Sequence, residues 1–468
     1  MCLVKPHHPS RPPNGPSARP RRGRDGRRSG VRPRFRHGLL AAALLAGGAT
    51  VPTTTAAADG GPAAAPPSEP GTAFYVPPAE LPAANGALVR TEELRLGLAL
   101  PGLNGPLPGE ATRIMYKSTD SDGQPVAVTG AYIEPSAEWP GAGPRPLVAL
   151  APGTMGQGDQ CAASKALETP LSVGEGSVSV GYENVAIYRF LAKGAAVVVT
   201  DYVGLGTTDR LHTYVNRLDG GHAVLDAVRA ARALPEASVT GDSPVGLYGY
   251  SEGGAATGSA AELQPVYAPD VELAGAYVGA PPADLAEVLK AVDGSTLAAA
   301  LGWSINGFQQ YEPRLKPILD AYTNDTGKRA LADLSTGCVG EGIFGYGGVA
   351  SSTWTTDGES VPEIVANEPV VQKMLDDQRL GGHAPAAPVR VATGIEDDLV
   401  PHAQARRLAV DWCAEGASVT YAPVSGPDVG EKLINHFLPL IIDQENAIDW
   451  VTARLDGRPA TSTCRAIA

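Results

Sequence analysis

The stretch "VGLYGYSEGGAAT", residues 245–257, decides the fold, because an apolar run ends there at a serine boxed by glycines. The residues before Ser251 are typical of a buried strand, and the small residues after it favour a helix. A serine on so tight a strand-to-helix turn has strained backbone angles, and its neighbours two positions away must lack bulk. The pattern G-x-S-x-G occurs once in the chain and predicts that Ser251 is a nucleophile. The alternative is an ordinary glycine-rich turn.

The segments around this turn alternate between strands and helices. Two strands joined by a turn at 120–123 are expected within residues 112–135. Further apolar strands are expected within 145–158, 195–208, 244–254, 271–282, 387–401 and 417–426, and helices within 221–234, 255–267 and 438–455. Continuous apolar strands alternating with helices predict an α/β fold with a mostly parallel central sheet covered on both faces.

Composition divides the 468 residues into five expected segments. A basic stretch, an apolar run of about a dozen residues and an Ala-rich end predict a signal peptide over 1–58, because the apolar run is too short to span a membrane. A flexible Pro/Ala-rich leader is expected over 59–84. Residues 85–283 and 389–468 are expected to form the two parts of the core, and 284–388 an inserted, mainly helical cap or lid domain over the carboxyl ends of the strands.

Charge and cysteine usage agree with export. Residues 1–37 hold eleven Lys or Arg and one acid, so their removal changes the net charge from −13 to about −23. Such an acidic chain argues against nucleic acid or an anionic membrane as a partner. No stable membrane insertion is expected, and transient contact with a lipid interface is allowed. Four cysteines remain after the signal, which suggests two disulfides with three pairings open, and their spacing resembles no metal site.

A serine hydroxyl needs a base, and the base needs an acid to orient it. In this kind of fold the chain order is serine, acid, histidine. His436, which follows the last strand and opens the closing helix, is the candidate base, and His402 is the alternative. Asp397, just after the strand that ends near residue 393, is the candidate acid, and Asp398 is its competitor as a residue that caps a helix.

The oxyanion of the tetrahedral intermediate requires preorganised N–H donors. One should be the amide after the nucleophile, that of Glu252. The other should come from the glycine-rich loop after an earlier strand, with Gly153 and Thr154 as candidates. A charged Glu252 beside the nucleophile is unusual unless its side chain points away or is paired.

Five stretches together resemble the secretory lipases of the lipase-A type, within the α/β-hydrolase superfamily, from about residue 85 to the C-terminus. They are "APGTMGQGDQCAAS", "VVVTDYVGLGTT", "GHAVLDAVRAARAL", "GYSEGG" and "GIEDDLVP". The resemblance implies hydrolysis of triacylglycerols and other esters, an acyl ester or lipid as the substrate, no metal or cofactor, and Ser251, Asp397 and His436 as the triad. Glu252, where the family often has glycine, and Pro152, where it often has histidine, depart from its pattern.

The resemblance also implies a disulfide between Cys161 and Cys338, which leaves Cys413 and Cys464 for the second. Tyr250, Trp303 and Phe308 are the candidate substrate-binding residues. The apolar residues of the insertion are expected to line an acyl tunnel or to form ordinary core: Leu297, Leu301, Trp303, Ile305, Phe308 and Tyr311.

The sequence therefore predicts a secreted serine lipase or esterase. One alternative is a short-chain, aryl or acetyl carboxylesterase, or a peptidase, on the same fold. The other is a catalytically silent secreted binding protein.

Overall fold

The computed structural model describes residues 72–100, 107–174, 177–207 and 209–467. The predicted signal peptide, residues 1–58, lies outside the described residues. Residues 72–84 differ from the flexible leader expected there, because Phe74 and Tyr75 are buried against the first strands, and Tyr75 is hydrogen-bonded to Ser164. Two aromatic side chains are enough apolar surface to fix this segment to the core.

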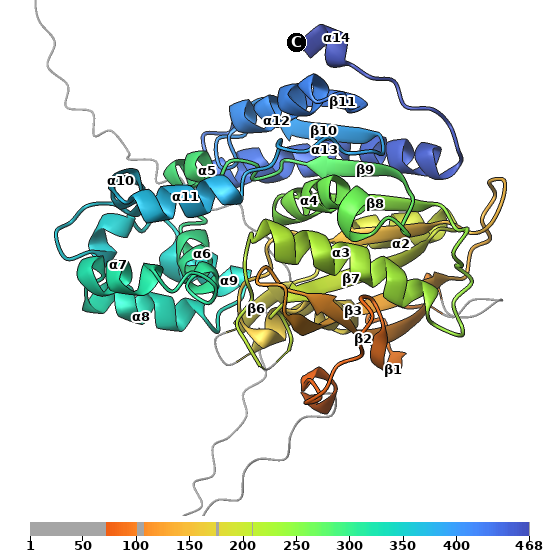
Figure 1. Ribbon diagram of the computed structural model, residues 1–468, viewed down its shortest axis with the longest axis horizontal. Helices are drawn as coiled ribbons and strands as arrows, with labels where there is room; N and C mark the ends of the chain where they lie inside the picture. Colours follow the sequence, from red (N-terminus) through yellow and green to blue (C-terminus); the bar gives the residue numbers. More distant parts are fainter. Residues whose placement is uncertain (1–71, 101–106, 175–176, 208, 468) are drawn as a thin grey trace, which may run out of the picture. The chain divides into compact units, whose positions relative to one another are not determined.

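In the described part of the chain, nine strands form one sheet in the order β1-β2-β3-β7-β4-β8-β9-β10-β11 (Figure 1). The first three pairings are antiparallel, and all pairings from β7 to β11 are parallel. The strands are β1 (Leu88–Leu94), β2 (Gly109–Thr119), β3 (Pro125–Pro135), β4 (Leu147–Ala151), β7 (Ala196–Val203), β8 (Val245–Tyr250), β9 (Leu273–Gly279), β10 (Val389–Gly394) and β11 (Val419–Val424). The predicted mostly parallel sheet is confirmed.

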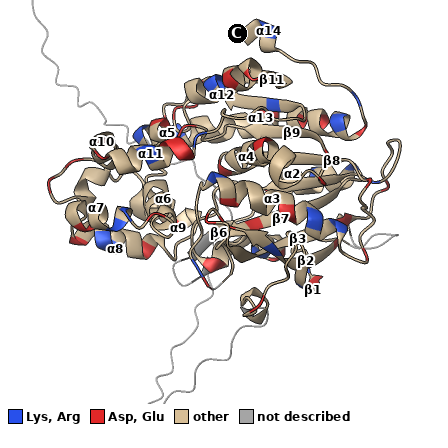
Figure 2. Cartoon of the chain, viewed as in Figure 1, with Lys and Arg blue, Asp and Glu red and all other residues tan. Residues whose placement is uncertain are grey.

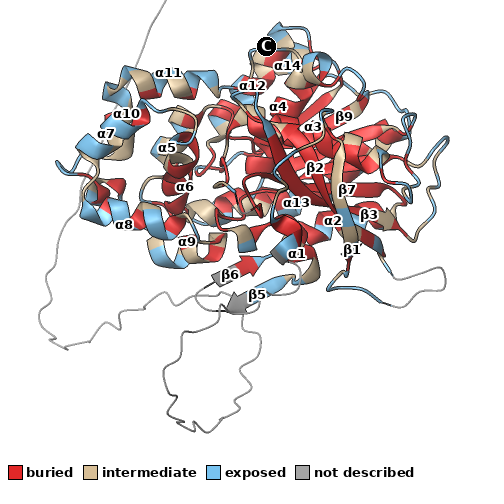
Figure 3. Ribbon diagram, turned by 60° about the horizontal axis from the view of Figure 1, so that its bottom comes forward, coloured by how far each residue is buried: buried red, intermediate tan, exposed pale blue. Residues whose placement is uncertain are grey.

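Helices cover both faces of this sheet, so its central strands are buried on both sides (Figure 3). Along β7, Val198 packs into one apolar cluster while Val197 and Val199 pack into the other, which explains a strand that is apolar at every position. The first cluster is closed by α3 (Arg217–Arg232), α4 (Glu252–Tyr267) and α12 (His402–Ala414). The second is closed by α1 (Ala163–Glu168), α2 (Asn184–Ala192) and α13 (Lys432–Leu455).

The interval between β9 and β10 is helical, as its composition predicted. We call residues 284–388 the inserted segment. It contains α5 (Leu285–Val292), α6 (Ala299–Phe308), α7 (Leu315–Tyr322), α8 (Asp325–Leu334), α9 (Val339–Tyr346), α10 (Val361–Asn367) and α11 (Pro369–Asp377). These helices gather at one side of the sheet (Figure 1) and have apolar clusters of their own.

Several short elements have no counterpart in the sequence-based expectations. They are the edge strand β1, the helices α1 and α2, a hairpin of β5 (Leu171–Gly174) and β6 (Ser177–Val180), and the C-terminal α14 (Cys464–Ile467). The closing helix α13 also starts earlier than predicted, at Lys432 rather than near residue 438, and Pro439 lies inside it. Figure 2 shows that Lys and Arg are spread over many elements rather than gathered on one.

Candidate active site

Ser251 lies on a strained turn between β8 and α4, with φ 59° and ψ −123°. A Cβ atom added at Gly249 would lie 2.2 Å from the carbonyl oxygen of Gly253, and one at Gly253 would lie 2.0 Å from that of Ala151. Both distances are far shorter than van der Waals contact. The glycines two positions before and after the serine are therefore steric requirements of this turn.

The structure brings Ser251, His436 and Asp397 into one hydrogen-bonded chain. The Nε2 atom of His436 lies 2.9 Å from the Oγ of Ser251, and its Nδ1 lies 2.8 Å from the Oδ2 of Asp397. Since a carboxylate only accepts, Nδ1 carries the proton and Nε2 is left to accept from the serine hydroxyl. The other carboxylate oxygen of Asp397 accepts from the backbone N–H groups of Leu399 and Val400.

The two competing side chains lie elsewhere. Neither ring nitrogen of His402 is bonded to Ser251: Nδ1 donates to the carbonyl of Gly394 at 2.9 Å, and Nε2 lies 2.8 Å from the hydroxyl oxygen of Tyr421. Asp398 is exposed, whereas Asp397 is buried against the imidazole.

Of the three predicted oxyanion donors, Gly153 is the one whose N–H is already engaged. It donates to the Oε1 of Glu183 at 2.9 Å. No described residue accepts a hydrogen bond from the N–H of Thr154, and Glu252 opens α4, where backbone N–H groups have no partner within the helix. The geometry therefore favours the amides of Thr154 and Glu252 over that of Gly153.

Sequence patterns did not reveal the residues that hold this loop. Glu183 is buried, and burial raises its pKa to about 7, although the N–H of Gly153 opposes the shift. The hydroxyl of Tyr182 donates to the carbonyl of Thr154 at 3.1 Å, that of Tyr214 lies 2.8 Å from the Oγ1 of Thr154, and that of Tyr202 donates to the carbonyl of Pro152 at 2.6 Å. A lone Glu or Tyr in a loop carries no motif, so only the fold identifies them.

Both expected disulfides are present. Cys161 is bonded to Cys338, and Cys413 to Cys464. The first joins the loop after β4 to the start of α9, and the N–H of Val339 donates to the carbonyl of Met155 nearby at 2.8 Å. The inserted segment is thus fastened directly to the loop that carries Thr154.

Ser251 opens into two cavities of unequal size. The larger, of about 130 Å³, extends into the inserted segment and is lined mostly by apolar side chains of α5, α6, α7, α10 and α11. The smaller, of about 20 Å³, lies on the side of His436 and is lined by Thr154, Tyr250, Leu433 and Phe437 among others.

The candidate substrate-binding residues have different positions around these cavities. Phe308 lines the larger cavity, as do Leu297, Leu301 and Ile305. Trp303 does not, contrary to expectation: it is fully buried in the core of the inserted segment, and its indole N–H donates to the carbonyl of Leu334. Tyr250 lines the small cavity, and its hydroxyl donates to the carbonyl of His436 at 2.7 Å.

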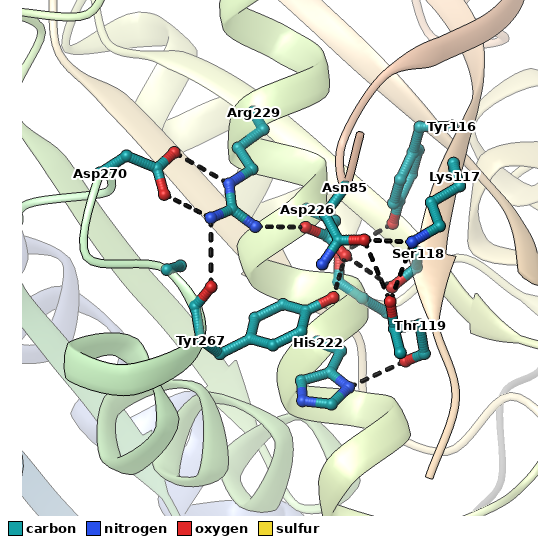
Figure 4. A network of polar contacts seen from close by, with 12 residues as sticks. Asn85, Tyr116, Lys117, Ser118, Thr119, His222, Asp226, Arg229, Tyr267 and Asp270 are labelled. Carbon is teal, nitrogen blue, oxygen red and sulfur yellow. Dashed lines mark hydrogen bonds and ion pairs between the residues drawn. The ribbon is translucent and has the colours of Figure 1, made fainter. Parts of the chain in front are cut away.

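A second buried polar cluster shares residue types with the first. We call Ser118, His222, Asp226, Arg229, Tyr267 and Asp270 the Asp226 cluster (Figure 4). Asp226 accepts from the hydroxyls of Ser118 and Tyr267 at 2.7 and 2.6 Å and pairs with Arg229 at 2.8 Å. His222 does not reach the carboxylate or the serine: its Nδ1 lies 2.8 Å from the carbonyl of Thr119, and its ring stacks on Tyr267.

In the part of the chain that the structure describes, no group of three or more His, Cys, Asp or Glu side chains is arranged to hold a metal ion. Among the same residues, no helix combines the length and the apolar character needed to cross a membrane.

Comparisons with known proteins support this description. The model of a family described as secretory lipase matches residues 168–463. The chain is 28% identical over 389 residues to a Mycobacterium tuberculosis protein named a probable inactive lipase, covering 83% of this chain and 82% of that protein. It is 29% identical over 411 residues to Lipase 2 of Candida albicans, covering 84% and 82%.

Solved structures share the fold at low sequence identity. The closed state of Candida antarctica lipase A superposes with a TM-score of 0.68 and 19% identity over 85% of this chain and 89% of that one. A rice cell wall degrading esterase from Xanthomonas oryzae gives a TM-score of 0.64 and 17% identity over 80% and 100%. The predicted α/β-hydrolase fold is confirmed.

Proposed function

Because the chain belongs to the secretory lipase family, we propose that it is a secreted serine lipase or esterase that hydrolyses carboxylic esters through Ser251, His436 and Asp397. The observation that carries the proposal is the hydrogen-bonded chain from Asp397 through His436 to Ser251, at the mouth of an apolar cavity. All three groups are present, in the tautomer and order that nucleophilic catalysis needs.

In this mechanism the Oγ of Ser251 attacks the ester carbonyl while the Nε2 of His436 takes its proton. The N–H groups of Thr154 and Glu252 stabilise the oxyanion, and the imidazolium of His436, stabilised by Asp397, returns the proton to the leaving alcohol. Water then attacks the acyl-enzyme with His436 again as the base, and the carboxylic acid leaves.

The two cavities suggest how an ester is oriented. An acyl chain suits the larger cavity, because its walls are almost wholly apolar and it penetrates the inserted segment. The smaller cavity, beside the imidazole that protonates the leaving group, suits the alcohol. The inserted segment then acts as a cap that determines the acyl length. The two disulfides, together with the signal peptide expected over residues 1–58, support export.

Hydrolysis of tributyrin and of a long-chain triglyceride emulsion tests this function, together with p-nitrophenyl esters from acetate to palmitate. We expect activity on esters of eight carbons or more, and none above background for Ser251→Ala. A strong preference for acetate would favour the short-chain esterase alternative. Inactivity on every ester by folded wild-type protein would support the silent scaffold, which the name of the M. tuberculosis relative makes worth testing.

A cavity variant tests the assignment of the acyl side. Ile305 lines the large cavity and is partly buried. Ile305→Trp should reduce activity on long-chain esters far more than on butyrate, because the added ring fills the cavity. Val266→Trp, at an 88% exposed position on α4, is the matched control and should leave the chain-length profile unchanged. Equal losses on all chain lengths for Ile305→Trp would contradict the assignment.

A further inference from the structure

The residue after the nucleophile carries a buried carboxyl group that the proposed mechanism does not use. Glu252 is 5% exposed, and its N–H is one of the two proposed oxyanion donors. A carboxylate so close to a developing negative charge opposes the stabilisation that the amide supplies, most strongly in an interior of low dielectric. The chain must therefore neutralise this group without moving the amide.

His212 is placed to do so. Its Nε2 lies 2.9 Å from the Oε1 of Glu252, and its Nδ1 lies 3.1 Å from the carbonyl oxygen of Val203. Because a carbonyl only accepts, Nδ1 carries a proton, and the contact between Nε2 and Oε1 holds one more. Whether that proton is on nitrogen or on oxygen, the pair has no net charge.

The surroundings hold the imidazole firmly in this position. His212 is 3% exposed, its ring stacks on Tyr202 at 5.7 Å, and Tyr214 meets it edge-on at 6.0 Å. The hydroxyls of the same two tyrosines contact Pro152 and Thr154 of the loop that supplies the other donor. Tyr202, His212 and Tyr214 thus contact both sides of the proposed oxyanion site.

Other ionisable groups also face the pair, and a pH profile must take them into account. Tyr202 and Tyr214 lie on its own side, and Tyr182 and Glu183 come from the segment that leads into α2. His436 and Asp397 lie beyond Ser251, and Arg217 lines a small cavity together with His212 and Glu252.

We propose that His212 is a positioning residue that forms an electrically neutral pair with the Glu252 side chain beside the oxyanion. This inference rests on the proposed function and adds to it a residue outside the triad. It also accounts for a charged residue where this family often has glycine.

A double-mutant cycle on p-nitrophenyl butyrate tests the proposal, with kcat and KM measured from pH 5 to 9 for wild type, His212→Leu, Glu252→Gln and the double variant. His212→Leu should lower kcat by about 10- to 100-fold with little change in KM, because the carboxyl group of Glu252 loses the partner that cancels its charge beside the oxyanion. The double variant has no ionisable group at residue 252, so its kcat should be at least tenfold higher than that of His212→Leu.

A defect in His212→Leu that is not relieved by Glu252→Gln would overturn the proposal, because it would show a packing role only. Thermal melting of each variant checks its fold. If His212→Leu melts below the assay temperature, His212→Gln replaces it, because glutamine keeps a polar contact but cannot become a cation. Fluorophosphonate labelling of the wild-type protein separates a failure of the proposed function from a failure of this inference. If Ser251 is not labelled, the proposed function is wrong. If Ser251 is labelled and the wild type is active, but the effects of the two substitutions are additive, only the role of His212 is wrong.

Discussion

The Ser251 and Asp226 clusters contain the same kinds of side chain, a serine, a histidine and a buried aspartate, but connect them differently. Around Ser251 the histidine stands between the other two, so that one ring nitrogen receives the hydroxyl proton while the other is held by Asp397. In the Asp226 cluster the serine donates directly to the carboxylate, and the histidine is bound to a backbone carbonyl (Figure 4).

Their surroundings differ as well. Ser251 faces an apolar cavity and lies on a strained turn, whereas Ser118 is fully buried in β2. The charge of the Asp226 carboxylate is compensated by Arg229, and both residues lie on α3. Arg229 also binds Asp270, and this second ion pair joins α3 to the loop before β9. Reactivity thus depends on the order of the hydrogen bonds and on access, and a cluster with the wrong order contributes to stability instead.

The largest expected effect is on Ser251, which has both the catalytic order of hydrogen bonds and access to a cavity. Ser251→Ala should lower kcat on p-nitrophenyl butyrate by about 10⁴-fold or more, because no other group can form the acyl-enzyme. Its melting temperature should stay close to that of the wild type, since alanine fits the same turn. Retention of more than a hundredth of the activity would show that the two serines differ less than their surroundings indicate.

The next effect is on stability. Asp226→Ala should lower the free energy of unfolding by about 3 kcal/mol or more, because Arg229 loses its buried partner and two hydroxyls lose their acceptor. The matched control is Asp270→Asn at the other, mostly exposed end of the ion pair, which should cost less than about 1 kcal/mol. Urea unfolding measures both, and equal losses would mean that burial does not distinguish the two carboxylates.

A third prediction concerns pH and Glu183, which connects the Ser251 region to the stability of the fold. Burial raises the pKa of Glu183 to about 7, from an ordinary value of 4.5. The folded state therefore binds more protons than the unfolded state between these values, so this group's contribution to stability falls as pH rises from 4.5 to 7. Gln at position 183 does not titrate. The free energy of unfolding of Glu183→Gln should therefore rise relative to that of the wild type by up to about 3 kcal/mol over that interval. Denaturation at pH 5 and pH 8 measures the change, and a constant difference would contradict it.

The smallest effect belongs to the other serine. Ser118→Ala should cost about 1 kcal/mol of unfolding free energy, the usual value of one hydrogen bond, and leave ester hydrolysis unchanged. Unfolding and kcat measured on the same preparation check both parts. A loss of activity that exceeds the loss of folded protein would mean that the Asp226 cluster influences the chemistry.

Much of this arrangement could be predicted from local pattern. Apolar runs marked the parallel strands, and the glycines around Ser251 marked the turn because no larger residue fits there. Chain order selected Asp397 and His436, the two residues that the structure brings to Ser251. These signals are local, or depend only on the order of the strands.

What could not be predicted depends on contacts between distant segments. The chain order serine, acid, histidine gives no role to a histidine before the nucleophile, yet His212 lies against Glu252 forty residues later. Trp303 looked like a tunnel residue, but an apolar stripe on a helix does not show which side faces a cavity. Gly153 was a reasonable oxyanion donor, but its N–H donates to the carboxylate of Glu183, a residue before α2 that belongs to no motif.

The reactivity of the Ser251 hydroxyl is the central claim. It is measured by reacting the folded wild-type protein with a fluorophosphonate and then mapping the labelled peptides. We predict a single adduct, on Ser251, that disappears in Ser251→Ala and forms far more slowly in His436→Ala, with Ser118 unmodified throughout. A wild-type protein that remains unmodified at Ser251, or one that carries the adduct on a different serine, would contradict the account.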